Sequence, residues 1–105
     1  MTATLRIIGN GPAIVYKLEK LSTTIGRHGD FKTPINHSSV SRLHCAIFDS
    51  GTLGIGAAVH TIRDLNSYTG TVVNGKSIGN KEKILSDGDK VSLGNHVVVL
   101  YRKGD

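Results

Sequence analysis

The chain has 105 residues, of which 38% are hydrophobic, 20% are charged and 5% are aromatic. This length supports one domain with a core of modest size, and the balance of apolar and charged residues is typical of a globular protein rather than a disordered one. The formal net charge of +5 favours anionic partners, but the basic residues are dispersed and aromatic residues are few, which argues against a nucleic-acid surface built on base stacking.

The cysteine count and the hydropathy pattern bear on cellular location. A single cysteine, Cys45, excludes a disulfide within the chain and fits a reducing compartment. No apolar run approaches the roughly 20 residues of a membrane span, and the N-terminus lacks the charged start and apolar core of a signal peptide. We therefore expect a cytoplasmic protein with one domain over residues 1–105, which binds no membrane and is a monomer.

The first half of the chain is predicted to form short strands joined by turns. Residues 4–8 and 13–18 have strand-like composition and flank a turn over 9–12, where glycine and asparagine accept positive φ. A third strand is expected over 22–26. A polar loop over 28–41 follows, because its glycine, proline, aspartate and asparagine residues favour neither a helix nor a central strand.

The second half continues the same pattern. Residues 44–49 and 59–65 are predicted to form two strands, with a longer loop over 50–56 whose Leu53 and Ile55 could fold back onto the sheet. Further strands are expected over 71–74, 76–78, 90–93 and 96–102. Within the last of these, residues 97–101 are continuously apolar, which predicts a strand buried on both faces.

No stretch of the chain has the apolar period of a helix over ten or more residues, and the nearest candidate, 81–85, is too short. Turn signals recur at intervals of about 8–12 residues, a spacing typical of a sandwich or barrel. The sequence therefore predicts an all-β fold: a two-sheet β-sandwich of about ten to eleven short, mostly antiparallel strands.

Three separated motifs carry groups suited to binding an anion. Gly26-Arg27 ends the third predicted strand, and Ser41-Arg42-Leu43-His44 leads into the fourth. Guanidinium groups, hydroxyls and free backbone N–H groups on loops are what a doubly charged phosphate requires from a protein. The third motif spans 64–75 and reads Asp-Leu-Asn-Ser-Tyr-Thr-Gly-Thr-Val-Val-Asn-Gly, and a fourth stretch, 85–94, resembles a pair of closing strands.

In this order, and over nearly the whole chain, these motifs resemble those of forkhead-associated (FHA) domains. The resemblance implies the FHA/SMAD-like sandwich and a non-catalytic signalling module that recognises phosphothreonine in a partner protein, with no cofactor. Arg27 stands where the family has the arginine that grips the phosphate. Ser41 stands at the family's phosphate-binding serine, and the backbone over 41–42 is expected to donate to the phosphate. Arg42 would add a second fixed charge.

The third motif departs from the family, whose usual pattern there is Ser-Thr-Asn-Gly-Thr. Tyr68 replaces a threonine that contacts the phosphate, and Thr69 replaces the asparagine that holds the peptide backbone. A tyrosine hydroxyl donates from farther out, and a threonine hydroxyl offers less than an amide, so peptide selectivity should differ from the usual one. The resemblance also implies that the binding loops are supported by Gly26, His44, Gly70, Asn74 and Gly75.

A second hypothesis keeps the sandwich but makes it a phosphate-independent interaction or oligomerisation domain. The altered residues 68–69 and the long loop over 50–56 motivate it, and an apolar patch around Leu53 and Ile55 would then form the contact surface.

Two enzyme-like patterns are also present in the chain. Ser41 and His44 lack a nucleophile elbow and an acid placed to orient the ring, so a hydrolase is not expected. Residues 70–77 match the nucleotide-binding pattern Gly-x4-Gly-Lys-Ser, but β-branched residues fill the middle of the loop and Gly79 interrupts any helix after it. The five histidines lie in separate elements, so no metal site is predicted.

Overall fold

The computed structural model describes residues 3–8, 14–32, 40–49, 59–94 and 97–104, and within these ranges it contains strands and no helix. In chain order the strands are β1 (Thr4–Ile8), β2 (Val15–Lys17), β3 (Ser22–Gly26), β4 (Phe31–Lys32), β5 (Cys45–Asp49), β6 (His60–Asp64), β7 (Thr71–Val73), β8 (Lys76–Ser77), β9 (Lys83–Ile84), β10 (Lys90–Leu93) and β11 (Val97–Arg102). The predicted all-β class is therefore confirmed.

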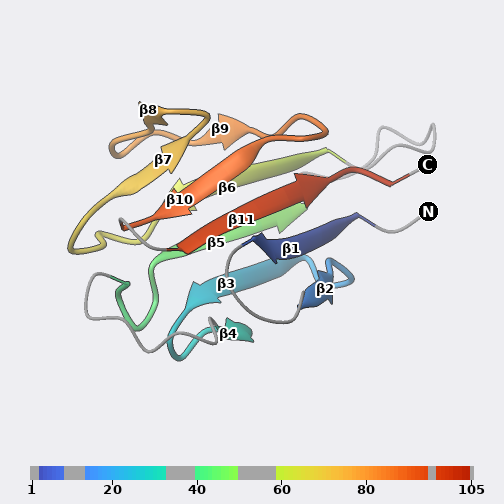
Figure 1. Ribbon diagram of the computed structural model, residues 1–105, viewed down its shortest axis with the longest axis horizontal. Coiled ribbons are helices and arrows are strands. Elements are labelled where there is room, and N and C mark those ends of the chain that lie inside the picture. The colour runs from blue at the N-terminus through green and yellow to red at the C-terminus, as the bar shows by residue number, and fades with distance from the viewer. Residues whose placement is uncertain (1–2, 9–13, 33–39, 50–58, 95–96, 105) are drawn as a thin grey trace.

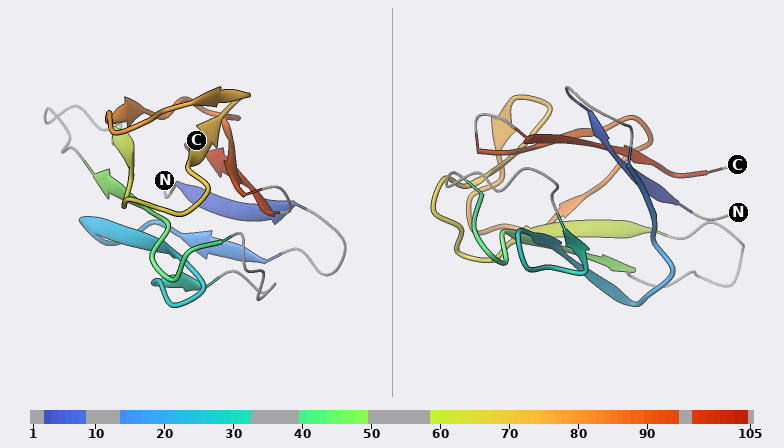
Figure 2. Two further views of the ribbon diagram at one scale, coloured as in Figure 1. Left: turned by 90° about the vertical axis from the view of Figure 1, so that its left-hand side faces the viewer. Right: turned by 60° about the horizontal axis from the view of Figure 1, so that its bottom comes forward.

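The strands form two sheets (Figure 1). One sheet has six strands in the order β2-β1-β11-β10-β7-β8, and the other has five in the order β4-β3-β5-β6-β9. Every pairing is antiparallel except that of β3 with β4, which is parallel. The two sheets lie face to face (Figure 2), so the predicted sandwich is also confirmed.

The core lies between the sheets because alternate side chains of each strand point inward. On the six-stranded sheet, Leu5 pairs with Tyr101 in register, and both side chains are fully buried. On the five-stranded sheet, Ile25, Cys45 and Ile47 are equally buried. Removing a side chain of this size from water contributes roughly 1.5–3 kcal/mol, so these inward rows are what holds the two sheets together.

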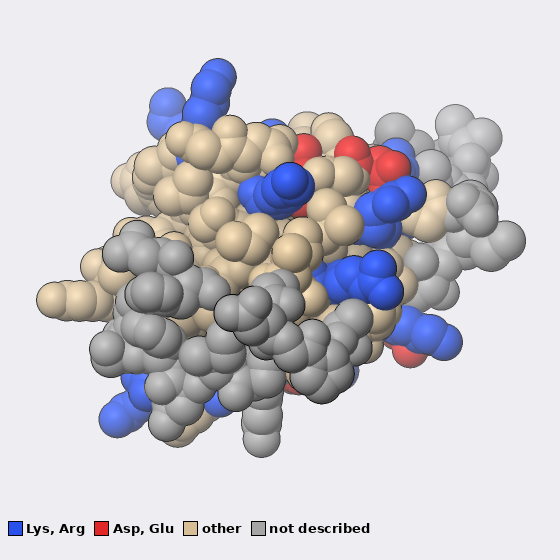
Figure 3. All heavy atoms as spheres, viewed as in Figure 1, with Lys and Arg blue, Asp and Glu red and all other residues tan. Residues whose placement is uncertain are grey.

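Strand β11 is buried on one face only, which corrects the expectation of burial on both. Val97, Val99 and Tyr101 are buried, whereas Val98 and Leu100 are half-buried on the outer face of the sheet. The apolar run predicted a strand correctly, but no described strand packs on this outer face. That face also carries Arg6 and Lys90 beside Leu100 in the register. Figure 3 shows the Lys and Arg side chains on this side of the molecule as separate groups rather than one continuous stripe.

Two strands were not predicted. Strands β4 and β9 contain two residues each, too few for a period of two to be recognised in the sequence. Phe31 of β4 is nevertheless buried, and its ring stacks on that of Tyr16 with 5.2 Å between the centroids. The loop over 50–56, with Leu53 and Ile55, lies outside the described residues.

A hydrogen bond between two side chains crosses the core. His60 of β6 and Tyr101 of β11 are both buried, and 2.7 Å separates His60 Nδ1 from the Tyr101 hydroxyl oxygen. Since a phenol donates readily, the arrangement fits a neutral His60 that accepts at Nδ1. Burial lowers the pKa of His60 and raises the pKa of Tyr101 to about 12, so both groups are neutral near pH 7.

Replacing Tyr101 by phenylalanine should destabilise the fold, because it leaves a buried imidazole nitrogen without its donor. We expect the free energy of unfolding, measured by urea denaturation, to fall by about 1–3 kcal/mol. Tyr16→Phe is the matched control, since the Tyr16 hydroxyl bonds no described residue. Equal losses in the two variants would contradict a role for the His60 contact.

The lowered pKa of His60 predicts a loss of stability in mild acid. The unfolded chain binds the proton at the ordinary pKa of about 6.5, whereas the folded chain resists it, so protonation favours unfolding. The contribution of His60 is complete well above pH 6.5 and should diminish as the pH falls below that value. Urea denaturation between pH 7.5 and 5.5 should therefore show a smaller decrease in stability for His60→Gln than for the native chain.

Candidate functional site

Three loops meet at one end of the sandwich. Strand β3 ends beside the start of β5, and β6 ends there too, because Ile25 pairs with Cys45 and Cys45 pairs with Asp64. The segments 27–30, 40–44 and 65–70 leave these strands, and we call them the end loops. They lie on the left of Figure 1 and face the viewer in the left panel of Figure 2.

Arg27 is attached to the neighbouring end loop through both its backbone and its side chain. Its backbone N–H donates to the carbonyl of Ser41 at 3.2 Å, and its Nε donates to the carbonyl of Val40 at 2.7 Å. A guanidinium held at Nε has a fixed orientation in its plane. Arg27 is therefore in direct contact with Val40, 13 residues further along the chain, and with the start of the second motif at Ser41.

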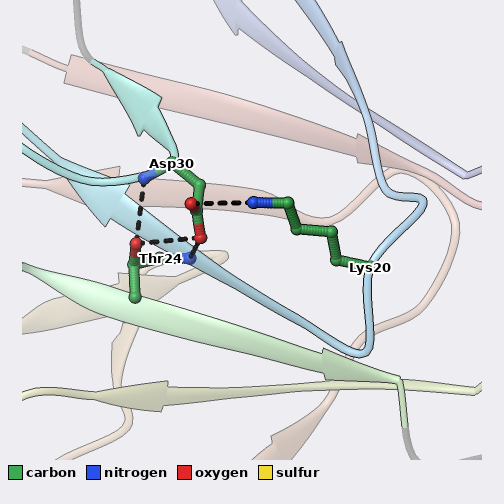
Figure 4. Close-up of polar contacts among 3 residues, drawn as sticks. All are labelled: Lys20, Thr24 and Asp30. Carbon is green, nitrogen blue, oxygen red and sulfur yellow. Dashed lines mark hydrogen bonds and ion pairs between the residues drawn. The ribbon is translucent and has the colours of Figure 1, made fainter.

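The turn that carries Arg27 is braced from behind by Asp30 (Figure 4). One carboxylate oxygen of Asp30 accepts from the backbone N–H and the hydroxyl of Thr24, and the other pairs with Lys20 at 3.0 Å. The backbone N–H of Asp30 donates back to the Thr24 hydroxyl. These bonds, first the one from the Thr24 backbone, lower the pKa of Asp30, which is therefore ionised at neutral pH.

Two glycines allow the end loops to approach so closely. A Cβ atom at Gly26 would lie 2.4 Å from the carbonyl oxygen of Arg42, and one at Gly29 would lie 2.7 Å from the carbonyl oxygen of Thr24. Both obstacles are backbone atoms, which cannot rotate away. Gly26 therefore permits the contact between the Arg27 turn and the Ser41 segment.

The hydroxyl of Ser41 lies between two end loops. Its Oγ accepts the backbone N–H of Tyr68 at 2.8 Å and keeps its own proton for another acceptor. The backbone N–H of Ser41, however, donates to Nδ1 of His44 at 3.1 Å. This corrects the expectation that the whole 41–42 backbone is available, since only the N–H of Arg42 has no acceptor among the described residues. The Arg42 side chain is exposed beside it.

His44 links the second end loop to the third from a fully buried position. Nδ1 accepts from the backbone of Ser41, and Nε2 lies 2.7 Å from the carbonyl oxygen of Gly70. A carbonyl can only accept, so the ring is the neutral tautomer with its proton on Nε2. Both ring nitrogens therefore have backbone partners, and neither can act as a base toward the hydroxyl of Ser41.

Asp64 organises the third end loop, and the sequence analysis did not identify it. Its carboxylate accepts from the backbone N–H of Ser67 at 2.9 Å, the hydroxyl of Ser67 and the hydroxyl of Thr71 at 2.7 Å. Burial alone would raise the pKa of Asp64, but these hydrogen bonds outweigh it and lower the pKa. The signal was an aspartate at a strand end followed three residues later by a serine, which is typical of an Asx-type turn.

The two residues that depart from the family motif lie on top of this loop. Tyr68 uses its backbone N–H to contact Ser41, while its side chain is 87% exposed. Thr69 is exposed as well, and Gly70 donates its backbone N–H to the hydroxyl of Ser67. The structure thus brings Arg27, Ser41, Arg42, Tyr68 and Thr69 to one end of the sandwich.

Asn74 and Gly75 lie elsewhere. They form the two-residue turn between β7 and β8, with φ values of 51° and 84°. A turn with positive φ at both central residues favours an Asn-Gly pair and is typical of tight β-hairpins. The Asn74 side chain bonds Asp89 and the backbone of Lys90, at the end of the sheet away from the end loops.

The nucleotide-binding pattern over 70–77 forms a β-hairpin in this structure. Lys76 and Ser77 belong to strand β8, so the pattern does not lead into a helix.

The described residues contain no group of three or more His, Cys, Asp or Glu side chains that could hold a metal ion. Cys45 is fully buried, and burial raises the pKa of its thiol, so it is a poor nucleophile. None of the described segments forms a helix long and apolar enough to cross a membrane.

Comparisons with known proteins identify the same motifs. The family model of the FHA domain matches residues 23–94, which include all three end loops. The FHA domain-containing protein FhaA of Mycobacterium tuberculosis (strain ATCC 25618 / H37Rv) is 31% identical over 93 residues, which are 89% of this chain. The match covers only 16% of FhaA, so the chain corresponds to a small part of that protein's length.

Solved structures are similar over nearly the whole chain. One, described as a structural and functional analysis of phosphothreonine-dependent FHA domain interactions, is 33% identical with a TM-score of 0.82, and covers 100% of this chain and 99% of that one. The FhaA FHA domain complexed with the intracellular domain of Rv3910 is 34% identical with a TM-score of 0.78, over 95% of this chain and 99% of that one. With its sandwich, its end loops and these similarities, the chain belongs to the FHA domain family.

Proposed function

We propose that this chain is a single, non-catalytic module that binds a phosphothreonine-containing segment of a partner protein at the end loops. The observation that carries the proposal is the contact of Arg27 with the backbone carbonyls of Val40 and Ser41, which holds this arginine against the segment that carries the Ser41 hydroxyl. The likeness to FHA domains, one of them described by its phosphothreonine-dependent interactions, supports the same ligand.

In the proposed complex, Arg27 pairs with the phosphate through its terminal nitrogens. The Ser41 hydroxyl and the backbone N–H of Arg42 donate to other phosphate oxygens, and the Arg42 side chain adds charge. Tyr68 takes part through its backbone, by orienting Ser41, because its side chain points to solvent. Thr69 lies next to it and would contact the peptide.

The expected affinity follows from these contacts. A phosphate carries about −1.5 to −2 charges at neutral pH, and each hydrogen bond to a charged group contributes roughly 1.5–3 kcal/mol. Three such bonds give about 4.5–9 kcal/mol before the costs of ordering the peptide and the gains from its flanking residues. We therefore expect a dissociation constant on the order of micromolar, which corresponds to a binding free energy of about −8 kcal/mol.

A protein partner is favoured over a free small molecule. The FhaA FHA domain, 34% identical to this chain, was solved in complex with an intracellular protein domain. We infer that the partner here is likewise a protein, whose flanking residues cover exposed side chains of the end loops such as Tyr68 and Leu43.

Replacing Arg27 by alanine should remove the strongest phosphate contact. By isothermal titration calorimetry, we expect binding of a phosphothreonine peptide to weaken by at least ~1.5 kcal/mol, more than tenfold. Arg6→Ala is the matched control, because Arg6 is an exposed arginine of β1 on the outer face of the other sheet. Equal binding of the phosphorylated and unphosphorylated peptides to the native chain would refute the proposal.

Replacing Ser41 by alanine should remove a donor to the phosphate and the acceptor of the Tyr68 N–H together. We expect roughly tenfold weaker phosphopeptide binding by fluorescence anisotropy, with a retained thermal transition. Ser92→Ala, a serine of β10 on the outer face of the sheet, serves as the control. A Ser41→Ala variant that binds as tightly as the native chain would place the phosphate away from this hydroxyl.

A further inference from the structure

A groove of about 510 Å³ lies along one side of the sandwich, where both sheets end. Strands β8 and β9, at the top of Figure 1, are each the last strand of their sheet in the strand order, so no described strand pairs with their outer edges. The described residues that line the groove are 76–78 and 81–84. We call it the edge groove, and none of these residues belongs to the end loops.

Two isoleucines form the apolar part of the edge groove. Ile84 of β9 is 62% exposed, and Ile78 is half-buried and packs against the core. A single exposed aliphatic side chain is ordinary on a protein surface, but here two of them line the same concave surface. A concave surface of this kind favours contact with an apolar side chain of a ligand.

The edge of β8 offers a backbone donor and a backbone acceptor. Ile78 donates its N–H to the carbonyl of Thr71, and the adjacent pair in the ladder is Val72 with Ser77. In an antiparallel ladder, hydrogen-bonded pairs alternate with pairs whose N–H and C=O groups point away from each other. The N–H and C=O of Ser77 therefore point away from β7, toward the open edge.

The edge of β9 offers a backbone donor in the same way. Leu85 donates its N–H to the carbonyl of His60, and the adjacent pair is Thr61 with Ile84. The N–H and C=O of Ile84 therefore point away from β6, and the carbonyl accepts from Nζ of Lys83 at 3.1 Å. An extended segment of another protein adds a strand to such an edge through main-chain hydrogen bonds.

The edge groove carries an excess of positive charge. Lys76, Lys81 and Lys83 line it, and Glu82 is the one acidic residue among the described residues of its lining. Nζ of Lys83 lies 3.9 Å from a carboxylate oxygen of Asp89. Lys76 and Lys81, by contrast, make no hydrogen bond or ion pair with any described residue. The groove is therefore complementary to a segment that carries carboxylates.

The same charges disfavour a second copy of this chain as the occupant. Two identical edges brought together would place lysine against lysine, and lysines on edge strands are a usual means of preventing such pairing. Ile84 works against that protection, because an aliphatic side chain exposed on an edge promotes association. Together these features favour a partner of opposite charge that has an aliphatic residue to bury.

We propose that the edge groove is a second protein-binding site, which takes an extended, unphosphorylated segment that carries aliphatic and acidic side chains. An aliphatic side chain of the segment packs on Ile78 and Ile84, and its carboxylates approach Lys76 and Lys81. The backbone of the segment pairs with the open edge at Ser77 or Ile84. This site is independent of phosphate recognition, so the module would hold two segments of its partners at once.

The test begins with a phage-displayed library of random, unphosphorylated peptides, selected on the native chain. Enriched peptides are synthesised and titrated into the isotope-labelled chain, and amide chemical shifts report both the affinity and the place of binding. The variants are Ile84→Ser and Lys81→Glu. Their matched controls are Leu21→Ser, which changes an aliphatic side chain that is 79% exposed, and Lys17→Glu, which changes an exposed lysine of β2. A thermal transition confirms that each variant is folded.

We expect the enriched peptides to combine aliphatic and acidic residues and to shift the amides of Ser77 and Ile84. Binding should weaken roughly tenfold in Ile84→Ser and roughly three- to tenfold in Lys81→Glu, with no change in either control.

Three results would overturn the site: no enrichment of acidic peptides, equal binding to the native chain and Ile84→Ser, or shifts confined to the end loops. Self-association of the native chain that is lost in Ile84→Ser would assign the groove to a second copy and would also overturn it. Phosphothreonine binding should be the same in all four variants, so these outcomes are distinct from a failure of phosphate recognition.

Discussion

The buried imidazole of His44 is the contact on which the end of the sandwich depends. It accepts from the backbone of Ser41 and donates to the carbonyl of Gly70, and so joins two loops that are separated by 26 residues in the chain. The Ser41 hydroxyl joins the same two loops, because it accepts from the backbone N–H of Tyr68. Because the ring is inside the core, the relative position of the loops is fixed by packing as well as by hydrogen bonds.

Charge at the site is arranged in a consistent way. The acidic groups near the end loops are satisfied within the protein: Asp30 by Thr24 and Lys20, and Asp64 by Ser67 and Thr71. They shape the turns without presenting bare negative charge to a ligand. Arg42, by contrast, is exposed, and Nε of Arg27 donates to the backbone carbonyl of Val40. An anion approaching this end therefore meets the exposed positive charge of Arg42.

The sequence was sufficient for the fold class and for the long strands, because the recurring turn residues and the apolar run of β11 are local signals. It was insufficient where the outcome depends on partners distant in the chain. Nothing in residues 97–101 indicates that no described strand covers their outer face, and the His60–Tyr101 bond joins residues 41 positions apart. The family motifs predicted that Arg27 and Ser41 belong to one site. Only the structure showed that the N–H of Ser41 is occupied, that Asp64 organises a loop and that Asn74 lies away from the end loops.

The two ends of the described chain lie together on the side opposite the end loops (Figure 1), since Thr4 pairs with Arg102 at the far end of the six-stranded sheet. Polypeptide attached before or after the domain would leave from that side. Such a domain can be carried as one unit of a larger protein, or tethered to a neighbour, while its ligand-facing end stays accessible. Tethering would then raise the local concentration of the module near its target without requiring any change in the loops themselves.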